Sequence, residues 1–366
     1  MKALAVTGIG IGLALAGAVG FALAGLFHTE PDWRDTAQAN TMPGRRAYTL
    51  PLNNPDMIPA ARASYMADDD VVLGIILHGQ ARAYPWWLVS NYHVVNDTVD
   101  QDPLLLTLCE ICGGASAFRP VLPELPDLAL SFQICGIGRG TIEIADHQTS
   151  SHWHPFLGTA LSGPLKGRSL ETLPLLLMTW KEWRGLYPGS VVANGSAELR
   201  QRPHGAQAGR IGDPDIPPPF LRSANLTDHR LGTHDLVLGI KKPGSDQAYA
   251  IPANRLIPFP NIFSATMGTN SVLLVRQTEL AITAFYLDAT GPPAEPVLLS
   301  KNPIQFRGPE GLTWNAFGIS TGAEKQERRL PSTRCYLTEW YEWVSHSPQS
   351  QIIDSVKSLP SAEIAP

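Results

Sequence analysis

Two stretches of the chain share one pattern: DVVLGIILHGQARAYP at residues 70–85 and DLVLGIKKPGSDQAYA at residues 235–250. Each has an apolar run, a polar turn with glycine and a second run that ends in Ala-Tyr, which is typical of a β-hairpin. Further along, residues 104–118 match residues 271–285 without a gap. Similarity that recurs in the same order along the chain indicates an internal duplication.

A Trp-x-x-Trp motif then follows in each half, at Trp180 and Trp183 and again at Trp340 and Trp343. Residues three apart lie on one face of a helix, so we expect both tryptophans of each motif to pack against a sheet. Together these patterns predict an α+β fold dominated by antiparallel sheets with short helices, in which two copies of one domain pack as a pseudo-symmetric pair. An all-β fold is the alternative.

The self-similarity also gives the expected domain boundaries. The expected segments are a transmembrane signal anchor at 1–28, an irregular lead-in at 29–60, copy one at 61–194, a proline-rich linker at 195–230, a degenerate copy two at 231–353 and a tail at 354–366.

The composition excludes several classes of protein. Of the 366 residues, 44% are hydrophobic and 17% are charged, which excludes a disordered chain. The net charge of −5 leaves no basic excess to neutralise phosphates, so we expect no nucleic-acid partner. The 32 glycines and 32 prolines favour turns and short strands over long helices.

The amino terminus has the pattern of a membrane segment. Residues 3–27 contain no charge, and as a helix they would span roughly 37 Å, which exceeds a hydrocarbon core of about 30 Å. A cleavable signal peptide, with a cleavage-like site at residues 22–24, is the alternative. Lys2 precedes the segment and acidic residues follow it, which favours a body outside the cytoplasm, periplasmic or extracellular.

Small residues recur every fourth position within this segment. On a helix they would form a smooth ridge that allows close approach of another transmembrane helix, although glycine and alanine are also common throughout the segment. The ridge consists of Gly8, Gly12, Ala16, Gly20 and Ala24.

The two copies differ most in the sequence Cys109-Glu-Ile-Cys112-Gly, where copy two has Arg276 and Glu279 in place of the cysteines. The hairpin therefore folds without them. A Cys-x-x-Cys turn suits a metal knuckle, a redox dithiol or a structural disulfide, and these alternatives stay open. A nucleophilic thiolate needs nearby positive charge, whereas Glu110 is adjacent, so the sequence favours a metal over thiol redox chemistry.

Several motifs of copy one, in order, resemble the uncharacterised domain-of-unknown-function family numbered 3179. Copy two is similar to the same pattern in degenerate form. The family usually has Cys-Pro-Leu-Cys, whereas this chain has Glu-Ile between the cysteines. The resemblance implies that His93, Cys109 and Cys112 act as a unit. The motifs are Tyr84-Pro85, Asn91-Tyr-His93, Asn96-Asp-Thr98, Cys109-x-x-Cys112-Gly113, Asp146-x-Gln-Thr149, Trp153 and Gly163-Pro-Leu165.

These residues predict a site for copper or zinc at Cys109, Cys112 and His93, because two thiolates and an imidazole suit those ions. The candidates to complete it are Cys135, Asp146 and His154. Each has a plainer interpretation, such as a buried structural cysteine or a solvated histidine. The glycines at residues 136–140 lack the spacing of a nucleotide-binding loop, so we expect no nucleotide cofactor.

The sequence thus predicts a membrane-anchored extracytoplasmic protein that holds a transition metal for metal handling or electron transfer. Two other functions stay open: a non-catalytic accessory or scaffold subunit of a membrane complex, and a thiol-disulfide redox protein. Whether the protein is an enzyme is not decided by the sequence.

Overall fold

The computed structural model describes residues 50–201, 215–242, 245–256, 261–287, 295–308, 311–321 and 327–362. Strands account for 46% of these residues and helices for 14%, so the protein is mostly β. The α+β prediction is therefore wrong. The sequence pattern indicated the two Trp-x-x-Trp helices correctly, but each of the helices described is a short element at the end or edge of a sheet rather than a layer.

Three sheets come from the first half of the chain. The first contains β1 (Leu52–Asn53), β5 (Val94–Val99), β6 (Asp102–Leu108), β7 (Ala115–Arg119) and β14 (Glu171–Leu173). The second contains β10 (Phe132–Gly138), β11 (Thr141–Asp146), β12 (His152–Trp153) and β13 (Ala160–Ser162). The third contains β15 (Leu176–Thr179), β3 (Val71–Leu77), β4 (Gln80–Pro85), β16 (Val191–Ala193) and β2 (Met57–Pro59). A small ribbon joins β8 (Val121–Leu122) to β9 (Leu125–Ala129).

Three further sheets come from the second half. One contains β25 (Arg334–Glu339), β17 (Leu236–Lys241), β18 (Ala248–Pro252) and β26 (Gln351–Ile352). The next contains β21 (Ile282–Leu287), β20 (Asn270–Arg276), β19 (Ile262–Met267) and β27 (Lys357–Ser358). The last contains β22 (Val297–Lys301), β23 (Ile304–Arg307) and β24 (Thr313–Asn315).

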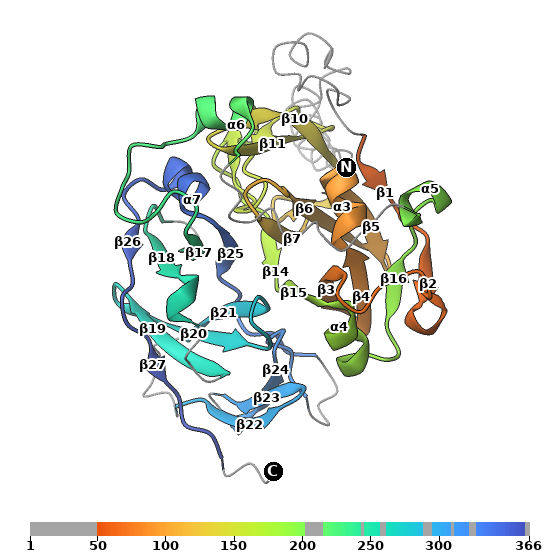
Figure 1. Cartoon of the computed structure of the whole chain (residues 1–366), viewed down its shortest axis with the longest axis vertical. Coiled ribbons are helices and arrows are strands. Elements are labelled where there is room, and N and C mark those ends of the chain that lie inside the picture. The colour runs from red at the N-terminus through yellow and green to blue at the C-terminus, as the bar shows by residue number, and fades with distance from the viewer. Residues whose placement is uncertain are drawn as a thin grey trace, which may run out of the picture.

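Among the described residues, the six sheets of three to five strands surround a common centre as the blades of a six-bladed β-propeller (Figure 1). The predicted pair of pseudo-symmetric copies is therefore also wrong as an architecture. The cores cross between the halves, so neither half is closed by itself. For example, Trp183 of the first half meets Phe317 of the second edge to face, with ring centroids 6.4 Å apart.

The Trp-x-x-Trp motifs lie on α4 (Trp180–Leu186) and α7 (Trp340–His346). Their tryptophans are buried against the hairpins that opened the sequence comparison. A Cβ atom added to Gly74 of β3 would lie 2.0 Å from the Trp183 ring, and one added to Gly239 of β17 would lie 2.2 Å from Trp343. Both hairpins thus use glycine to admit an indole, and the predicted packing is confirmed for Trp183 and Trp343.

The other described helices connect or cover the sheets. They are α3 (Trp86–Tyr92), α5 (Ala197–Arg200), α6 (Pro218–Ser223) and the 3₁₀ turns η2 (Ala60–Arg62) and η4 (Ala253–Arg255). None of the helices described is both long enough and apolar enough to cross a membrane. The predicted anchor and its ridge of small residues lie outside the described residues.

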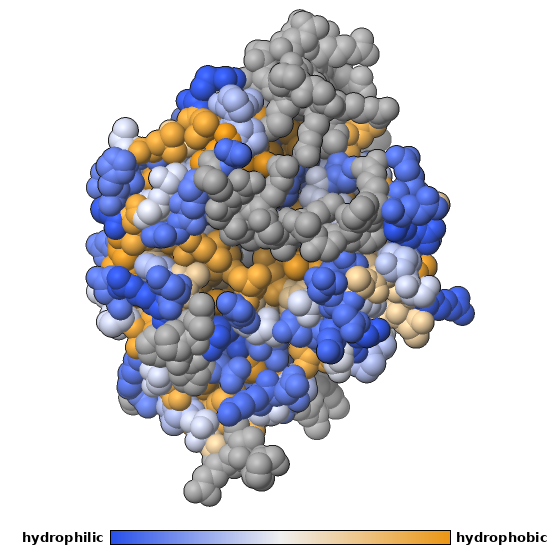
Figure 2. All heavy atoms as spheres, viewed as in Figure 1, coloured by the Kyte–Doolittle hydropathy of each residue, from blue (hydrophilic) through white to orange (hydrophobic). Residues whose placement is uncertain are grey.

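Hydrophilic side chains cover much of the outer rim of one face, and hydrophobic ones appear toward its middle (Figure 2). A cavity of about 370 Å³ lies between β14 and the segment that precedes β25, with Leu173 and Leu330 among its lining residues. The two halves of the chain therefore share this cavity as well as their cores.

Candidate functional site

The Cys-x-x-Cys motif forms the tight turn between β6 and β7. Cys109 and Gly114 close it with a backbone hydrogen bond of 2.9 Å, and Gly113 adopts a positive φ of 75° that glycine tolerates without strain. Both cysteines are completely buried, and both thiols are free. The turn thus holds a reduced pair of sulfurs in a dry environment.

The two sulfurs of this turn are chemically unequal. Burial acts to raise the pKa of Cys109, but hydrogen bonds from the thiol and backbone amide of Cys112 stabilise its thiolate and lower the pKa overall. Burial and the neighbouring Cys109 raise the pKa of Cys112. The Sγ atom of Cys112 also lies 3.4 Å from Oγ1 of Thr141. Of the two sulfurs, Cys109 is therefore the one whose thiolate form is better stabilised.

His93 lies beside this turn, because it ends α3 immediately before β5, which pairs with β6. It adopts a left-handed φ of 61°, and its Nδ1 atom lies 3.2 Å from the carbonyl oxygen of Leu108 and 3.1 Å from Oε2 of Glu110. Since both neighbours are acceptors, Nδ1 carries the proton. Burial acts to lower the pKa of His93, but the Glu110 carboxylate outweighs burial and raises it.

Glu110 has a second part besides the one inferred from its position in the sequence. Its adjacency to Cys109 suggested a carboxylate that opposes a thiolate, and it does act to raise the pKa of Cys109. In the structure the carboxylate also lies 3.1 Å from Nδ1 of His93 and raises the pKa of that imidazole. The pKa of Cys109 is lowered overall because the hydrogen bonds from Cys112 outweigh this opposition.

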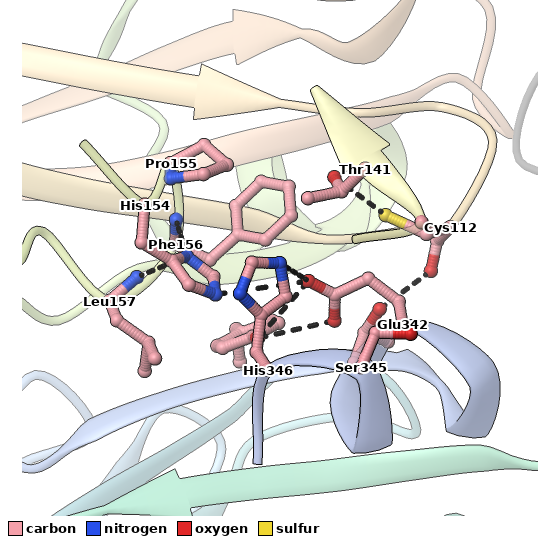
Figure 3. Close-up of polar contacts among 12 residues, drawn as sticks. Cys112, Thr141, His154, Pro155, Phe156, Leu157, Glu342, Ser345 and His346 are labelled. Carbon is pink, nitrogen blue, oxygen red and sulfur yellow. Dashed lines mark hydrogen bonds and ion pairs between the residues drawn. The ribbon is translucent and has the colours of Figure 1, made fainter. Parts of the chain in front are cut away.

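The second half of the chain closes over the turn. The carbonyl oxygen of Cys112 accepts hydrogen bonds from Oγ1 of Thr338 at 3.0 Å and from the backbone amide of Glu339 at 3.1 Å. Helix α7 follows directly and presents Glu342 beneath Cys112 (Figure 3). The Trp-x-x-Trp pattern by itself indicates only a helix packed on a sheet, and its glutamate does not distinguish α7 from α4, because α4 has Glu182 at the same place in its motif.

Glu342 belongs to a polar group with His154 and His346, and the three side chains are buried (Figure 3). Its Oε1 atom lies 4.0 Å from Nε2 of His154 and 3.7 Å from Nε2 of His346. Burial raises the pKa of Glu342 to about 8, lowers that of His346 to about 3 and lowers that of His154 well below its ordinary value. Two histidines and a carboxylate at this spacing could hold a metal ion.

The tautomer of His154 argues against a metal in this buried group. Its Nδ1 atom accepts hydrogen bonds from the backbone amides of Phe156 and Leu157, at 3.0 and 3.2 Å. The neutral ring therefore carries its proton on Nε2, the nitrogen that faces Glu342, and a protonated nitrogen is not a ligand. The group is better described as a buried polar cluster beneath Cys112.

The three residues that we considered as additional ligands have other partners. Asp146 is buried and accepts hydrogen bonds from the backbone amide of Thr149 and from the indole of Trp153, so its part is structural. His154 belongs to the polar cluster with Glu342 and His346. Cys135 lies with Glu143 and His152, and these form a second group that could hold a metal.

His93, Cys109 and Cys112 do not form a comparably tight group. Among the described residues, the two groups whose donor atoms all lie within 4.8 Å of one another are those of Glu342 and of Cys135. An ion at the Cys-x-x-Cys turn would therefore require the His93 side chain to close toward the sulfurs.

Residues 50–350 match the family model described as a protein of unknown function, DUF3179. The chain belongs to this family. The match covers both halves of the propeller, including the Cys-x-x-Cys turn and α7. No curated protein and no solved structure matches the chain.

Proposed function

We propose that Cys109, Cys112 and His93 bind one soft transition metal ion, copper(I) or zinc(II), for metal handling or electron transfer. The orientation of His93 carries the proposal. Its Nδ1–H is held by the carbonyl of Leu108 and the carboxylate of Glu110, which leaves Nε2 as the free donor nitrogen. A carboxylate or carbonyl on the far nitrogen is the usual second-shell arrangement of a metal-binding histidine.

The charge and burial of the sulfurs support the same ion. The lowered pKa of Cys109, which persists despite the burial that opposes it, favours the thiolate form that binds a metal. Thiolates and an imidazole select copper(I) or zinc over magnesium or calcium, which prefer oxygen ligands. In the second half, Arg276 occupies the position that corresponds to Cys109. The proposal therefore expects one site of this kind per chain.

Metal analysis tests the proposal directly. The reduced full-length chain is loaded with copper(I) or with zinc(II), desalted and analysed for bound metal. We expect Cys109→Ser to lose one ion per chain relative to the wild type, and Cys335→Ser to lose none, because Cys335 lies on β25 outside the site. Equal metal content in the wild type and Cys109→Ser would contradict the proposal.

The second candidate function is thiol–disulfide exchange, favoured by the hydrogen bond from the Cys112 thiol to the Cys109 sulfur. Oxidation of the pair would form one sulfur–sulfur bond and release two protons and two electrons to a disulfide partner. Rapid alkylation of Cys109 in the metal-free chain near neutral pH supports it, and slow alkylation argues against it because the thiolate is then out of reach.

The accessory-subunit function rests on the ridge at residues 8–24, beyond the part of the chain that the structure describes. The membrane anchor and the location outside the cytoplasm rest on the same segment. These stay predictions, and comigration of the chain with a larger membrane complex, lost on replacing Gly12 and Gly20 by leucine, would test them.

A further inference from the structure

We propose that Cys135, Glu143 and His152 form a second metal site, which takes a single zinc ion and is separate from the Cys-x-x-Cys turn. Three neighbouring strands supply one ligand each: β10 supplies the thiol, β11 the carboxylate and β12 the imidazole. The Nδ1 atom of His152 lies 3.7 Å from Sγ of Cys135 and 3.8 Å from Oε2 of Glu143.

An irregularity in the sheet brings these side chains to one face. The pairing of β10 with β11 shifts register between Ile134 and Gly136, which makes Cys135 the additional residue of a β-bulge. Bulges redirect side chains, and here the bulge turns a thiol that regular alternation would place elsewhere toward Glu143. His152 pairs with Ala145, which is two residues from Glu143 and therefore on the same face of the sheet.

Strand β10 leaves room for the carboxylate of Glu143. A Cβ atom added to Gly138 would lie 2.3 Å from Oε1 of Glu143, so only glycine permits the carboxylate to lie across this end of β10. The glycine at position 138, within a segment that does not fit a nucleotide-binding loop, thus has a physical explanation.

The spacing of the donor atoms matches a tetrahedral zinc ion. Zinc–sulfur and zinc–nitrogen bonds of about 2.3 and 2.0 Å at a tetrahedral angle place sulfur and nitrogen about 3.5 Å apart, and nitrogen and oxygen about 3.3 Å apart. The two observed distances exceed these values by only a few tenths of an ångström. Small side-chain rotations would therefore complete the site.

Charge and exposure define the class of site. One thiolate and one carboxylate neutralise a divalent ion, and a mixed sulfur, nitrogen and oxygen donor set suits zinc rather than magnesium or calcium. The side chains of His152 and Glu143 are 41% and 26% exposed, so solvent reaches the ion. With three protein ligands, the fourth position is open to water or to a small anionic ligand.

The inference uses none of the residues of the proposed function, so the two can fail separately. The experiment uses the full-length chain that carries Cys109→Ser and Cys112→Ser, so that the first proposed site is removed. Cobalt(II) is the probe, because it replaces zinc and gives a thiolate-to-metal charge-transfer band and intense visible bands in a tetrahedral site. We expect a saturable signal at one cobalt ion per chain, displaced by zinc.

Three further variants in this background identify the ligands. Cys135→Ser should abolish the charge-transfer band, and His152→Ala should weaken cobalt binding by more than the roughly 10–100-fold that loss of a second-shell partner costs. Gly138→Ala should also weaken binding, by displacing the Glu143 carboxylate. Cys335→Ser is the control and should leave the signal unchanged, because that thiol has no such cluster around it among the described residues.

Two outcomes would overturn the inference: no saturable cobalt signal in the background variant, or a signal that survives Cys135→Ser. If the variant with serine at positions 109 and 112 does not fold, alkylation of the wild-type chain tests the inference instead. Zinc should then protect Cys135 from alkylation, as read by mass spectrometry of its peptide, while Cys335 stays as reactive as without zinc. Equal alkylation of Cys135 with and without zinc would contradict the site.

Discussion

The hairpin β6–β7 and the hairpin β20–β21 have the same framework and different turns. Ser116 of β7 donates to the carbonyl oxygen of Phe156 at 3.0 Å, and the corresponding Thr283 of β21 donates to that of Ala316 at 2.7 Å. The framework contacts are thus shared. The strands of such a hairpin can therefore form with quite different side chains in the turn that joins them.

The turns themselves are held in different ways. In β20–β21, the Gln277 side chain accepts from the amide of Ile304 and donates to the carbonyl of Lys301. In β6–β7, Glu110 occupies the corresponding position and contacts His93 instead. One turn thus has an amide that ties it to a neighbouring strand, and the other has a carboxylate that contacts an imidazole, so the two turns differ in what their side chains hold.

Removing the indole that packs beneath each of the two first-mentioned hairpins, β3–β4 and β17–β18, should give the largest loss of stability. It also tests which tryptophan helix supports the metal site. Trp183→Ala and Trp343→Ala each remove a fully buried side chain, so we expect each to lower the free energy of unfolding by about 3–5 kcal/mol. Denaturant unfolding measures this loss. Metal content per folded chain should fall only for Trp343→Ala, because α7 supports the Cys112 turn. Equal metal loss in both variants would show that α7 gives the Cys112 turn no more support than α4 does.

Substitution of Glu110 tests whether the carboxylate orients His93. In Glu110→Gln the acceptor charge is lost, and we expect metal affinity at the Cys-x-x-Cys turn to fall about 10–100-fold, or about 1.4–2.7 kcal/mol. Competition with a chelator measures the affinity. Gln277→Glu is the matched control in the other turn and should leave metal affinity unchanged, although it alters the contact with Lys301. Unchanged affinity in Glu110→Gln would mean that the carboxylate has no such part.

Sequence patterns predicted what is local. The hairpins and the tryptophan helices follow from periodicity, whereas the six-bladed closure depends on contacts between distant sheets that periodicity does not contain. The hydrogen bond from Thr338 to Cys112 spans 226 positions, so nothing local could indicate that α7 closes the site. The grouping of Cys135 with His152 depends on a bulge, which disrupts the alternation on which a strand prediction rests.

The buried carboxylate of Glu342 should make stability depend on pH. Burial raises its pKa to about 8, so above pH 4.5 the folded chain keeps a proton that the unfolded chain has lost. The free energy of unfolding therefore falls as the pH rises toward 8, by up to about 1.4 kcal/mol per pH unit. His346, with its pKa lowered to about 3 by burial, acts in the opposite direction only below pH 6.5.

Comparison of the wild type with Glu342→Gln, by denaturant unfolding between pH 6.5 and 8, isolates this contribution from that of His93, whose pKa is also raised. Glu342→Gln keeps the shape of the protonated group and should make the slope shallower. Glu182→Gln is the matched control in α4, where the glutamate is an exposed helix-capping residue, and it should keep the wild-type slope. An unchanged slope in Glu342→Gln would assign the titration to another group.

The smallest expected effect concerns the contact that joins the two halves at the site. Thr338→Val removes the hydroxyl that donates to the carbonyl of Cys112, and we expect a loss of about 0.5–1.5 kcal/mol in the free energy of unfolding. Thr179→Val, which removes the capping box of α4, should cost a similar amount because it deletes a helix cap. Only Thr338→Val should also change the alkylation rate of Cys109, since it loosens the turn. If both variants alter that rate equally, the sensitivity of the thiol reflects overall stability, and α7 is not a specific clamp on the turn.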